Sequence, residues 1–252
     1  MTYMIKMFIH RALYQIQAMG HNRDLVHLMD GSVEDWENEG GRLDTEPTKV
    51  VCADDLDLTK ETKYNATDAQ NVVDMEEVKK IIEQGDQADS IIVDARSEDR
   101  FYGRVDEPRP GLRLGHMPGA KNLFFFSLLD ESNPTRLKSK EELKKSIANA
   151  GIDINTDKRI VASCGSGATA CKYINDCSIC SSSKVRSSIL SSCQLTDTFY
   201  HCYRVGAVAA ALDVCGRDPS KTYIYDGSWM EWGAEKETPI TKEGDPKRKR
   251  DE

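Results

Sequence analysis

One of the eight cysteines, Cys164, stands in a sequence context that suits a nucleophile. It follows the run 159–163, which is typical of a buried β-strand, and it opens the loop Cys164-Gly165-Ser166-Gly167-Ala168-Thr169. The two glycines permit a tight turn in which backbone N–H groups converge, and a helix predicted from Ala168 adds the positive end of its dipole. A thiol attacks as its thiolate, which these groups stabilise. We therefore predict that Cys164 is a covalent nucleophile.

Two other readings of this cysteine are weaker. A phosphatase loop also places a cysteine after a strand, but it needs an arginine at the sixth position after the cysteine to hold phosphate. That position is Ala170 here, which disfavours phosphate chemistry. A buried thiol beside a turn is the structural alternative for a lone cysteine, and the flanking glycines count against it at Cys164.

The segments around this loop alternate between strand and helix patterns. Short runs rich in β-branched residues are predicted to be strands, and longer amphipathic or apolar runs are predicted to be helices. The predicted strands are 90–94, 121–126, 159–163 and 222–225, and the predicted helices are 75–84, 140–150 and 207–215. This alternation indicates an α/β fold with a parallel sheet flanked by helices. The Cys164 loop then lies at the carboxyl edge of the sheet, where ligands bind.

A short internal repeat marks two places in the chain. The shift that places Gly20 on Gly216 also places the Asp-Gly-Ser triplet 30–32 on 226–228, and Trp36 on Trp232, without a gap. In each copy a helical stretch ends at the glycine and a short predicted strand, 25–29 or 222–225, precedes the triplet. Two homologous domain ends explain this shared spacing better than chance does.

The two copies differ in what precedes them. Residues 1–46 are too few to bury a core alone, so we interpret them as the remnant of an N-terminal domain. The polar stretch 47–72 is the predicted linker, and 73–235 is the predicted catalytic domain. Residues 236–252, which include the basic run 247–250, are predicted to form a disordered tail.

The predicted catalytic domain contains an irregular insertion at 172–206, rich in serine and cysteine, without a helical or strand period. It contains Cys177, Cys180, Cys193, His201 and Cys202. These residue types suit zinc, but their spacings fit no common zinc finger, so we expect no metal there. Removing the insertion joins Cys171 to Ala207 and restores one apolar helix, which leads to the hypothesis that 172–206 is a translated intron.

Further motifs surround this framework. They are Asp-Ala-Arg at 94–96 with Arg100, Glu-Pro-Arg-Pro-Gly at 107–111, Gly-His-Met-Pro-Gly-Ala at 115–120 and Asp-Gly-Ser-Trp at 226–229. With the loop that begins at Cys164, they resemble the C-terminal domain of the two-domain rhodanese and 3-mercaptopyruvate sulfurtransferase family. The resemblance covers roughly residues 74–233 apart from the insertion, and residues 11–46 resemble the end of the family's N-terminal domain. It implies a rhodanese-like parallel sheet.

The resemblance implies a sulfurtransferase that carries sulfur as a persulfide on Cys164. It assigns Arg100 and Arg109 to a clamp for the donor's carboxylate, since a guanidinium fork matches a carboxylate. Ser166 would hand a proton to the departing group. The amides of the loop, which includes Gly165, Gly167 and Thr169, would stabilise the persulfide anion. No metal or organic cofactor is implied.

The loop composition favours 3-mercaptopyruvate as the small-molecule sulfur donor. Thiosulfate is a dianion whose enzymes place basic residues directly after the cysteine, whereas this chain has Gly165 and Ser166 there. The acceptor would be cyanide or a thiol such as thioredoxin. Three alternatives stay open: a thiosulfate sulfurtransferase, a sulfur-relay module that passes persulfide to a partner, as in tRNA thiolation, and a chain that is inactive without a complete N-terminal domain.

Two further residues resemble catalytic groups but are assigned structural roles. His116 lies in the motif at 115–120, for which the resemblance implies a turn. Asp94 is expected to fix its loop rather than to transfer a proton.

The composition argues against several other classes. A formal charge of −8 is unsuited to a nucleic-acid surface, which needs clustered lysine and arginine. No apolar stretch approaches the roughly 20 residues that span a bilayer, so we expect no membrane partner, and we expect no secretory leader. Cysteines spread unevenly through a chain of 252 residues indicate thiols in a reducing compartment. The family analogy suggests the cytoplasm or the mitochondrion.

Overall fold

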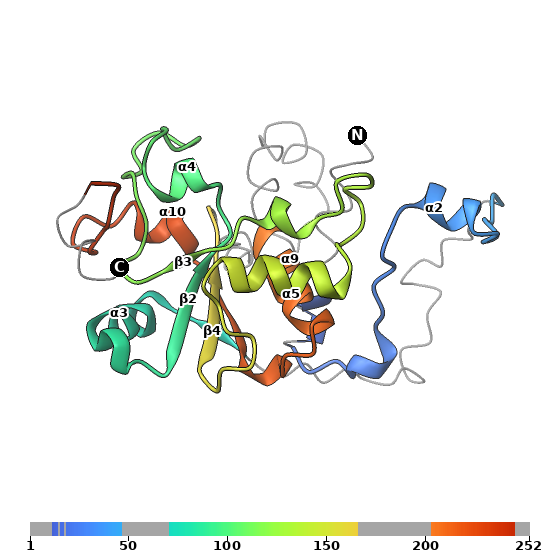
Figure 1. Ribbon diagram of the computed structural model, residues 1–252, viewed down its shortest axis with the longest axis horizontal. Coiled ribbons are helices and arrows are strands. Elements are labelled where there is room, and N and C mark those ends of the chain that lie inside the picture. Colours follow the sequence, from blue (N-terminus) through green and yellow to red (C-terminus); the bar gives the residue numbers. More distant parts are fainter. Residues whose placement is uncertain (1–11, 15, 18, 47–70, 166–202, 245–252) are drawn as a thin grey trace, which may run out of the picture.

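A five-stranded sheet forms the centre of the molecule in the computed structural model, which describes residues 12–46 except 15 and 18, 71–165 and 203–244 (Figure 1). The strands are β1 (Val72–Val73), β2 (Ser90–Asp94), β3 (Lys121–Asn122), β4 (Arg159–Ser163) and β5 (Thr222–Tyr225). Their order is β1-β5-β4-β2-β3, and every neighbouring pair is parallel. The predicted α/β fold with a helix-flanked parallel sheet is therefore confirmed, and β4 is its middle strand.

Helices cover both faces of the sheet. In Figure 1, α3 (Met75–Gln84) and α10 (Ser228–Trp232) lie on one side, and α5 (Lys140–Asn149) and α9 (Tyr203–Val214) lie on the other. Two short helices also belong to the described elements, α2 (Val33–Asn38) and α4 (Glu98–Phe101). The described 3₁₀ turns are Arg23–Leu25, Gly85–Gln87, Phe125–Leu128 and Pro219–Lys221. Side chains cap α3 and α5: Asp74 accepts the Glu77 N–H at 2.9 Å, and Ser139 and Glu142 form a capping box.

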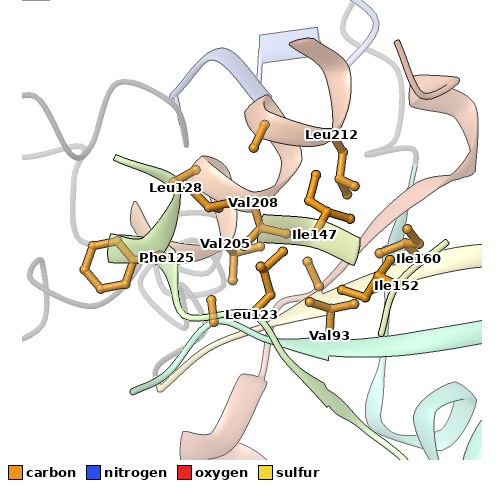
Figure 2. Packing of buried hydrophobic residues seen from close by; sticks show 14 of the residues in the cluster. Val93, Leu123, Phe125, Leu128, Ile147, Ile152, Ile160, Val205, Val208 and Leu212 are labelled. Atoms are coloured by element: carbon orange, nitrogen blue, oxygen red, sulfur yellow. The ribbon is translucent and has the colours of Figure 1, made fainter. Parts of the chain in front are cut away.

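The central strands β2, β4 and β5 are buried on both faces, and apolar residues fill most of their positions. In β4, Ile160 and Ala162 point to the layer of α5 and α9, while Val161 points to the layer of α3 and α10. Figure 2 shows Val205, Val208 and Leu212 of α9, which pack against the face of the sheet that carries Ile160. Their helical spacing aims one stripe of α9 at the sheet.

The predicted bounds of β2, β4, β5 and α3 agree with the structure. The predicted strands at 25–29 and 121–126 do not agree with it. Residues 25–29 form no strand, because Asn22 caps a 3₁₀ turn there and the described part of the sheet offers that segment no neighbour. The predicted strand 121–126 stops at Asn122. The Leu123 N–H still donates to the Asp94 carbonyl at 3.0 Å, but the chain then enters the 3₁₀ turn Phe125–Leu128, which ends the strand.

Two predicted boundaries also require correction. The helix expected from Ala207 begins at Tyr203, and Val205 is buried in its first turns as Val208 is. Residues 203–206 therefore belong to α9 and not to the irregular insertion. The rest of the predicted insertion, 172–202, lies outside the described residues. Residues 236–244, predicted as tail, fold against the domain: Thr241 pairs with His116, and Glu243 bonds Arg104 at 2.6 Å. The basic run 247–250 lies outside the described residues.

The N-terminal segment contacts the domain through polar groups. The Tyr14 hydroxyl donates to the carbonyl of Asn71 at 2.6 Å, and Arg23 pairs with Asp213 at 2.9 Å. Asp35 of α2, also in the N-terminal segment, accepts a hydrogen bond at 2.9 Å from the side-chain amide of Asn133, which lies in the domain. Across the described ranges, no helix has the length and apolar character that crossing a bilayer requires.

Candidate active site

The carboxyl ends of three neighbouring strands meet around Cys164. Cys164 directly follows β4, Ser228 follows β5 by three residues, and the turn after β2 leads through Arg96 to Arg100 in α4. Because parallel strands all end at the same edge, these segments converge although they are far apart in sequence. The Trp229 N–H donates to the Cys164 carbonyl at 3.0 Å, which ties α10 to the loop.

Cys164 is buried, with an exposed fraction of 1%, and the Ser228 side chain contacts it. The Cys164 N–H donates to the Ser228 Oγ at 3.2 Å, and the Ser228 hydroxyl lies 3.7 Å from the Cys164 Sγ. The same hydroxyl lies 2.9 Å from the Tyr225 carbonyl. A hydroxyl carries one proton, so it donates to the carbonyl or to the sulfur, and an anionic sulfur is the stronger attraction.

Sequence reasoning missed Ser228 as a site residue. Its φ of 50° lies in the left-handed region, which costs a residue with a side chain on the order of 1–3 kcal/mol and is maintained only where the surroundings enforce it. The signal was present in the Asp-Gly-Ser-Trp motif at 226–229, but its meaning depends on β5 lying next to β4, which the sequence order of the strands does not reveal.

Arg100, one of the two predicted clamp residues, lies beside the loop. A Cβ atom added to Gly165 would lie 2.6 Å from Arg100 Nη2 and 3.2 Å from Nη1, so the guanidinium packs on the backbone next to Cys164. Its exposed fraction is 7%, and its Nη1 has no hydrogen-bond partner in the described part of the chain. Glu107 binds the other edge of the guanidinium through Nε and Nη2.

Arg109, the second predicted clamp residue, is half-buried and reaches the other side of the same edge. Its Nη1 contacts the sulfur of Met230 in α10, two residues after Ser228. The structure thus places Arg100 against Gly165 and Arg109 against α10. The other predicted site residues, Ser166, Gly167 and Thr169, lie outside the described residues.

Asp94 and His116 have the contacts of structural residues. Asp94 accepts the N–H of Arg96 at 2.9 Å and holds the Arg96 guanidinium with both oxygens, while that guanidinium lies 4.1 Å from the ring centre of Trp229. His116 is buried, stacks on Phe101 with ring centres 3.8 Å apart, and has its Nδ1 2.8 Å from the Phe101 carbonyl oxygen.

The second cysteine in the described ranges is chemically different from Cys164. Cys215 lies at the end of α9 with its sulfur 3.8 Å from the Lys140 carbonyl, and burial raises the pKa of its thiol. A raised pKa keeps this thiol protonated and unreactive. Neither Cys164 nor Cys215 forms a disulfide, and the described residues contain no cluster of metal-ligating side chains.

Comparisons with known proteins agree with this architecture. A family model described as rhodanese-like domain matches residues 74–235. The chain is 29% identical over 227 residues to the 3-mercaptopyruvate sulfurtransferase of Mus musculus, covering 88% of this chain and 57% of the relative. It is 28% identical over 246 residues to the thiosulfate/3-mercaptopyruvate sulfurtransferase 1, mitochondrial, of Arabidopsis thaliana, covering 91% of this chain and 52% of the relative.

A similar fold is found in the crystal structure of the Tum1 protein from Saccharomyces cerevisiae. The TM-score is 0.63 at 22% sequence identity, and the match covers 94% of this chain and 66% of that one. The chain spans somewhat more than half the length of the two sulfurtransferases named above. The match of the family model across most of the chain shows that this protein belongs to the rhodanese-like domain family.

Proposed function

We propose that this chain is a sulfurtransferase that takes sulfur from 3-mercaptopyruvate and carries it as a persulfide on Cys164. The observation that carries the proposal is the placement of Cys164 at the end of the middle strand, with the Ser228 hydroxyl 3.7 Å from its sulfur and the Arg100 guanidinium against Gly165. The name of the mouse relative supports this donor.

The first step forms one bond and breaks one. The Cys164 thiolate attacks the sulfur of 3-mercaptopyruvate, an S–S bond forms, and the C–S bond breaks with its electron pair moving to carbon. The leaving group is the enolate of pyruvate, which takes up the proton that the donor thiol loses; we assign the transfer of that proton to Ser166. The persulfide left on Cys164 is an anion that the Ser228 hydroxyl and the loop amides stabilise.

The second step regenerates the enzyme. A thiol, such as that of reduced thioredoxin, or cyanide attacks the outer sulfur, and the Cys164 thiolate is the leaving group. No external oxidant is needed, because the electron pair of the broken C–S bond stays with the pyruvate enolate and the sulfur atom is transferred without it. We place this chemistry in the cytoplasm or the mitochondrion, in line with the relative that is named as mitochondrial.

Arg100 and Arg109 are proposed to bind the carboxylate of the donor. Arg100 presents a buried Nη1 without a partner in the described ranges, and a buried donor of this kind gains from a charged acceptor. Arg109 approaches from the side of α10. A carboxylate held by both would place the rest of the donor over the Cys164 loop.

Thiosulfate is the second candidate donor, because the Arabidopsis relative carries both donors in its name. A sulfur-relay role, in which a partner protein receives the persulfide with little turnover of small molecules, is a third candidate. Steady-state kinetics with both donors and cyanide as acceptor separates them. We expect the higher kcat/KM with 3-mercaptopyruvate; a higher value with thiosulfate would reverse the assignment, and a persulfide without turnover of either donor would favour the relay.

A further inference from the structure

Four buried charged side chains form a continuous chain behind the Cys164 loop. They are Asp94, Arg96, Glu107 and Arg100, in the order of their contacts. The side chains of the first three are 0–1% exposed, and that of Arg100 is 9% exposed. Two acids and two bases make this tetrad neutral as a unit, which is the condition under which charges can be buried at moderate cost.

Glu107 is the branch point of the tetrad. Its Oε1 accepts from Arg96 Nη1 at 2.8 Å and from Arg100 Nε at 3.3 Å, and its Oε2 accepts from Arg100 Nη2. Arg96 is already committed to the core, because Asp94 binds it and its Nη2 donates to the Gly115 carbonyl at 2.8 Å. One guanidinium is therefore structural.

The other guanidinium belongs to the reactive edge. Within the described ranges, Glu107 supplies every hydrogen bond of the Arg100 side chain, and the Arg100 Nη1 has no partner. This guanidinium packs on Gly165, next to Cys164. The position of Arg100 and the balance of its charge thus both depend on Glu107.

We propose that Glu107 is a specificity-determining residue, which fixes Arg100 beside the Cys164 loop and offsets its charge so that the site accepts a monoanionic donor rather than a dianionic one. The proposal rests on the proposed function and deepens it. With Glu107 ionised, the tetrad adds no net charge at Gly165. Without that carboxylate the edge gains one positive charge, which favours a dianion over a monoanion.

The test uses the full chain and two unreactive probes of similar size, pyruvate as the monoanion and sulfate as the dianion. A probe bound at Arg100 should protect Cys164 from alkylation, and site-resolved mass spectrometry gives the concentration of each probe that halves the rate of alkylation at Cys164. In Glu107→Gln, we expect the protection by sulfate relative to pyruvate to rise about tenfold. In Glu107→Asp, which keeps the charge and loses reach, both probes should weaken while their ratio stays near that of the wild type.

A matched control separates this effect from the loss of any ion pair. Glu77→Gln breaks a Glu–Arg pair of the same type, in which Arg159 Nη1 lies 2.6 Å from Glu77 at the opposite end of β4. This variant should leave the ratio of the two probes unchanged. An unchanged ratio in Glu107→Gln, or an equal change in the control, would overturn the proposal.

The double variant Arg100→Gln/Glu107→Gln covers the case in which Glu107→Gln does not fold. Arg100→Gln alone leaves the tetrad one negative charge in excess, so sulfate should lose more protection than pyruvate, and adding Glu107→Gln should restore the ratio. A double variant that keeps the ratio of Arg100→Gln would also overturn the proposal. Because protection needs no turnover, these results are independent of whether 3-mercaptopyruvate is the donor.

Discussion

The hydroxyl of Ser228 lies 3.7 Å from the sulfur of Cys164 and accepts the Cys164 N–H at 3.2 Å. One side chain therefore contacts both the sulfur and the backbone of the proposed nucleophile. Its alternative acceptor, the Tyr225 carbonyl, lies at 2.9 Å, so the hydroxyl proton has a second acceptor whenever the sulfur is neutral. This arrangement allows Ser228 to respond to the charge on sulfur without moving the backbone.

Ser228→Ala should slow persulfide formation on Cys164. A hydrogen bond to a charged group contributes about 1.5–3 kcal/mol, which corresponds to a loss of roughly ten- to a hundredfold in rate. Stopped-flow or quenched reactions with 3-mercaptopyruvate measure it. The control is Ser163→Ala, one residue before the cysteine, whose buried hydroxyl has no partner in the described ranges. Equal losses in the two variants would remove Ser228 from the site.

The two arginines should differ in what they do for stability. Arg109→Ala and Arg100→Ala should each raise KM for 3-mercaptopyruvate by about tenfold or more, since each removes a charged contact to the carboxylate. Only Arg100→Ala should also lower the free energy of unfolding, by about 3–5 kcal/mol, because it takes a buried partner from Glu107. Denaturant unfolding separates them, and unchanged KM values in both variants would place the clamp elsewhere.

Gly165→Ala should impair substrate binding through Arg100. The new Cβ would lie 2.6 Å from Arg100 Nη2, and the guanidinium has little room to move because it is buried and bound to Glu107. We expect a higher KM for 3-mercaptopyruvate. Gly216→Ala is the control: its φ of 91° makes it strained, but nothing lies within 4 Å of the added atom, so stability should fall while KM stays constant. A normal KM in Gly165→Ala would contradict the placement of Arg100.

Acid should loosen the contact between α2 and the loop around Asn133. Hydrogen bonds from Ser32, with further contributions from Arg136 and Asn133, hold the pKa of Asp35 at about 2, below its ordinary 3.8. Because the pKa of Asp35 is lower in the folded state, its ionised carboxylate stabilises the contact fully above pH 3.8. This stabilisation is lost as the pH falls through about 2.

Amide exchange tests this directly. Asp35→Asn should speed exchange in Val33–Asn38 at neutral pH, and the difference from the wild type should shrink as the pH falls through about 2 and disappear at about pH 1, where the carboxyl is protonated. A difference that persists at that pH would mean that the carboxylate charge is not what holds the contact.

Much of the sheet could be predicted from sequence because its strands are buried on both faces. The runs 90–94, 159–163 and 222–225 are rich in β-branched residues, and their bounds agree with the structure. The segment 25–29 has the same local pattern but no neighbouring strand in the described part of the chain. A strand pattern states only that a segment can pair, and the partner decides whether it does.

The site was predictable in its residue types and not in its contacts. Cys164 and Arg100 stand in local motifs. Ser228 depends on a pairing between distant segments, because β5 beside β4 brings it to Cys164, whereas Glu107 is close in sequence to Arg96 and reaches it only through the path of the loop after β2. No local pattern gives strand order or the path of a loop, so these two residues required the structure.

The most direct test of the account is the location of transferred sulfur. The purified chain is incubated with 3-mercaptopyruvate, and its peptides are analysed by mass spectrometry without reduction, alongside Cys164→Ser and Cys215→Ser. We predict one added sulfur atom on Cys164 in the wild type and in Cys215→Ser, and none in Cys164→Ser, which should remain folded because the change is nearly isosteric. Added sulfur on Cys171 or Cys215, with Cys164 unmodified, would contradict the assignment of Cys164 as the sulfur carrier.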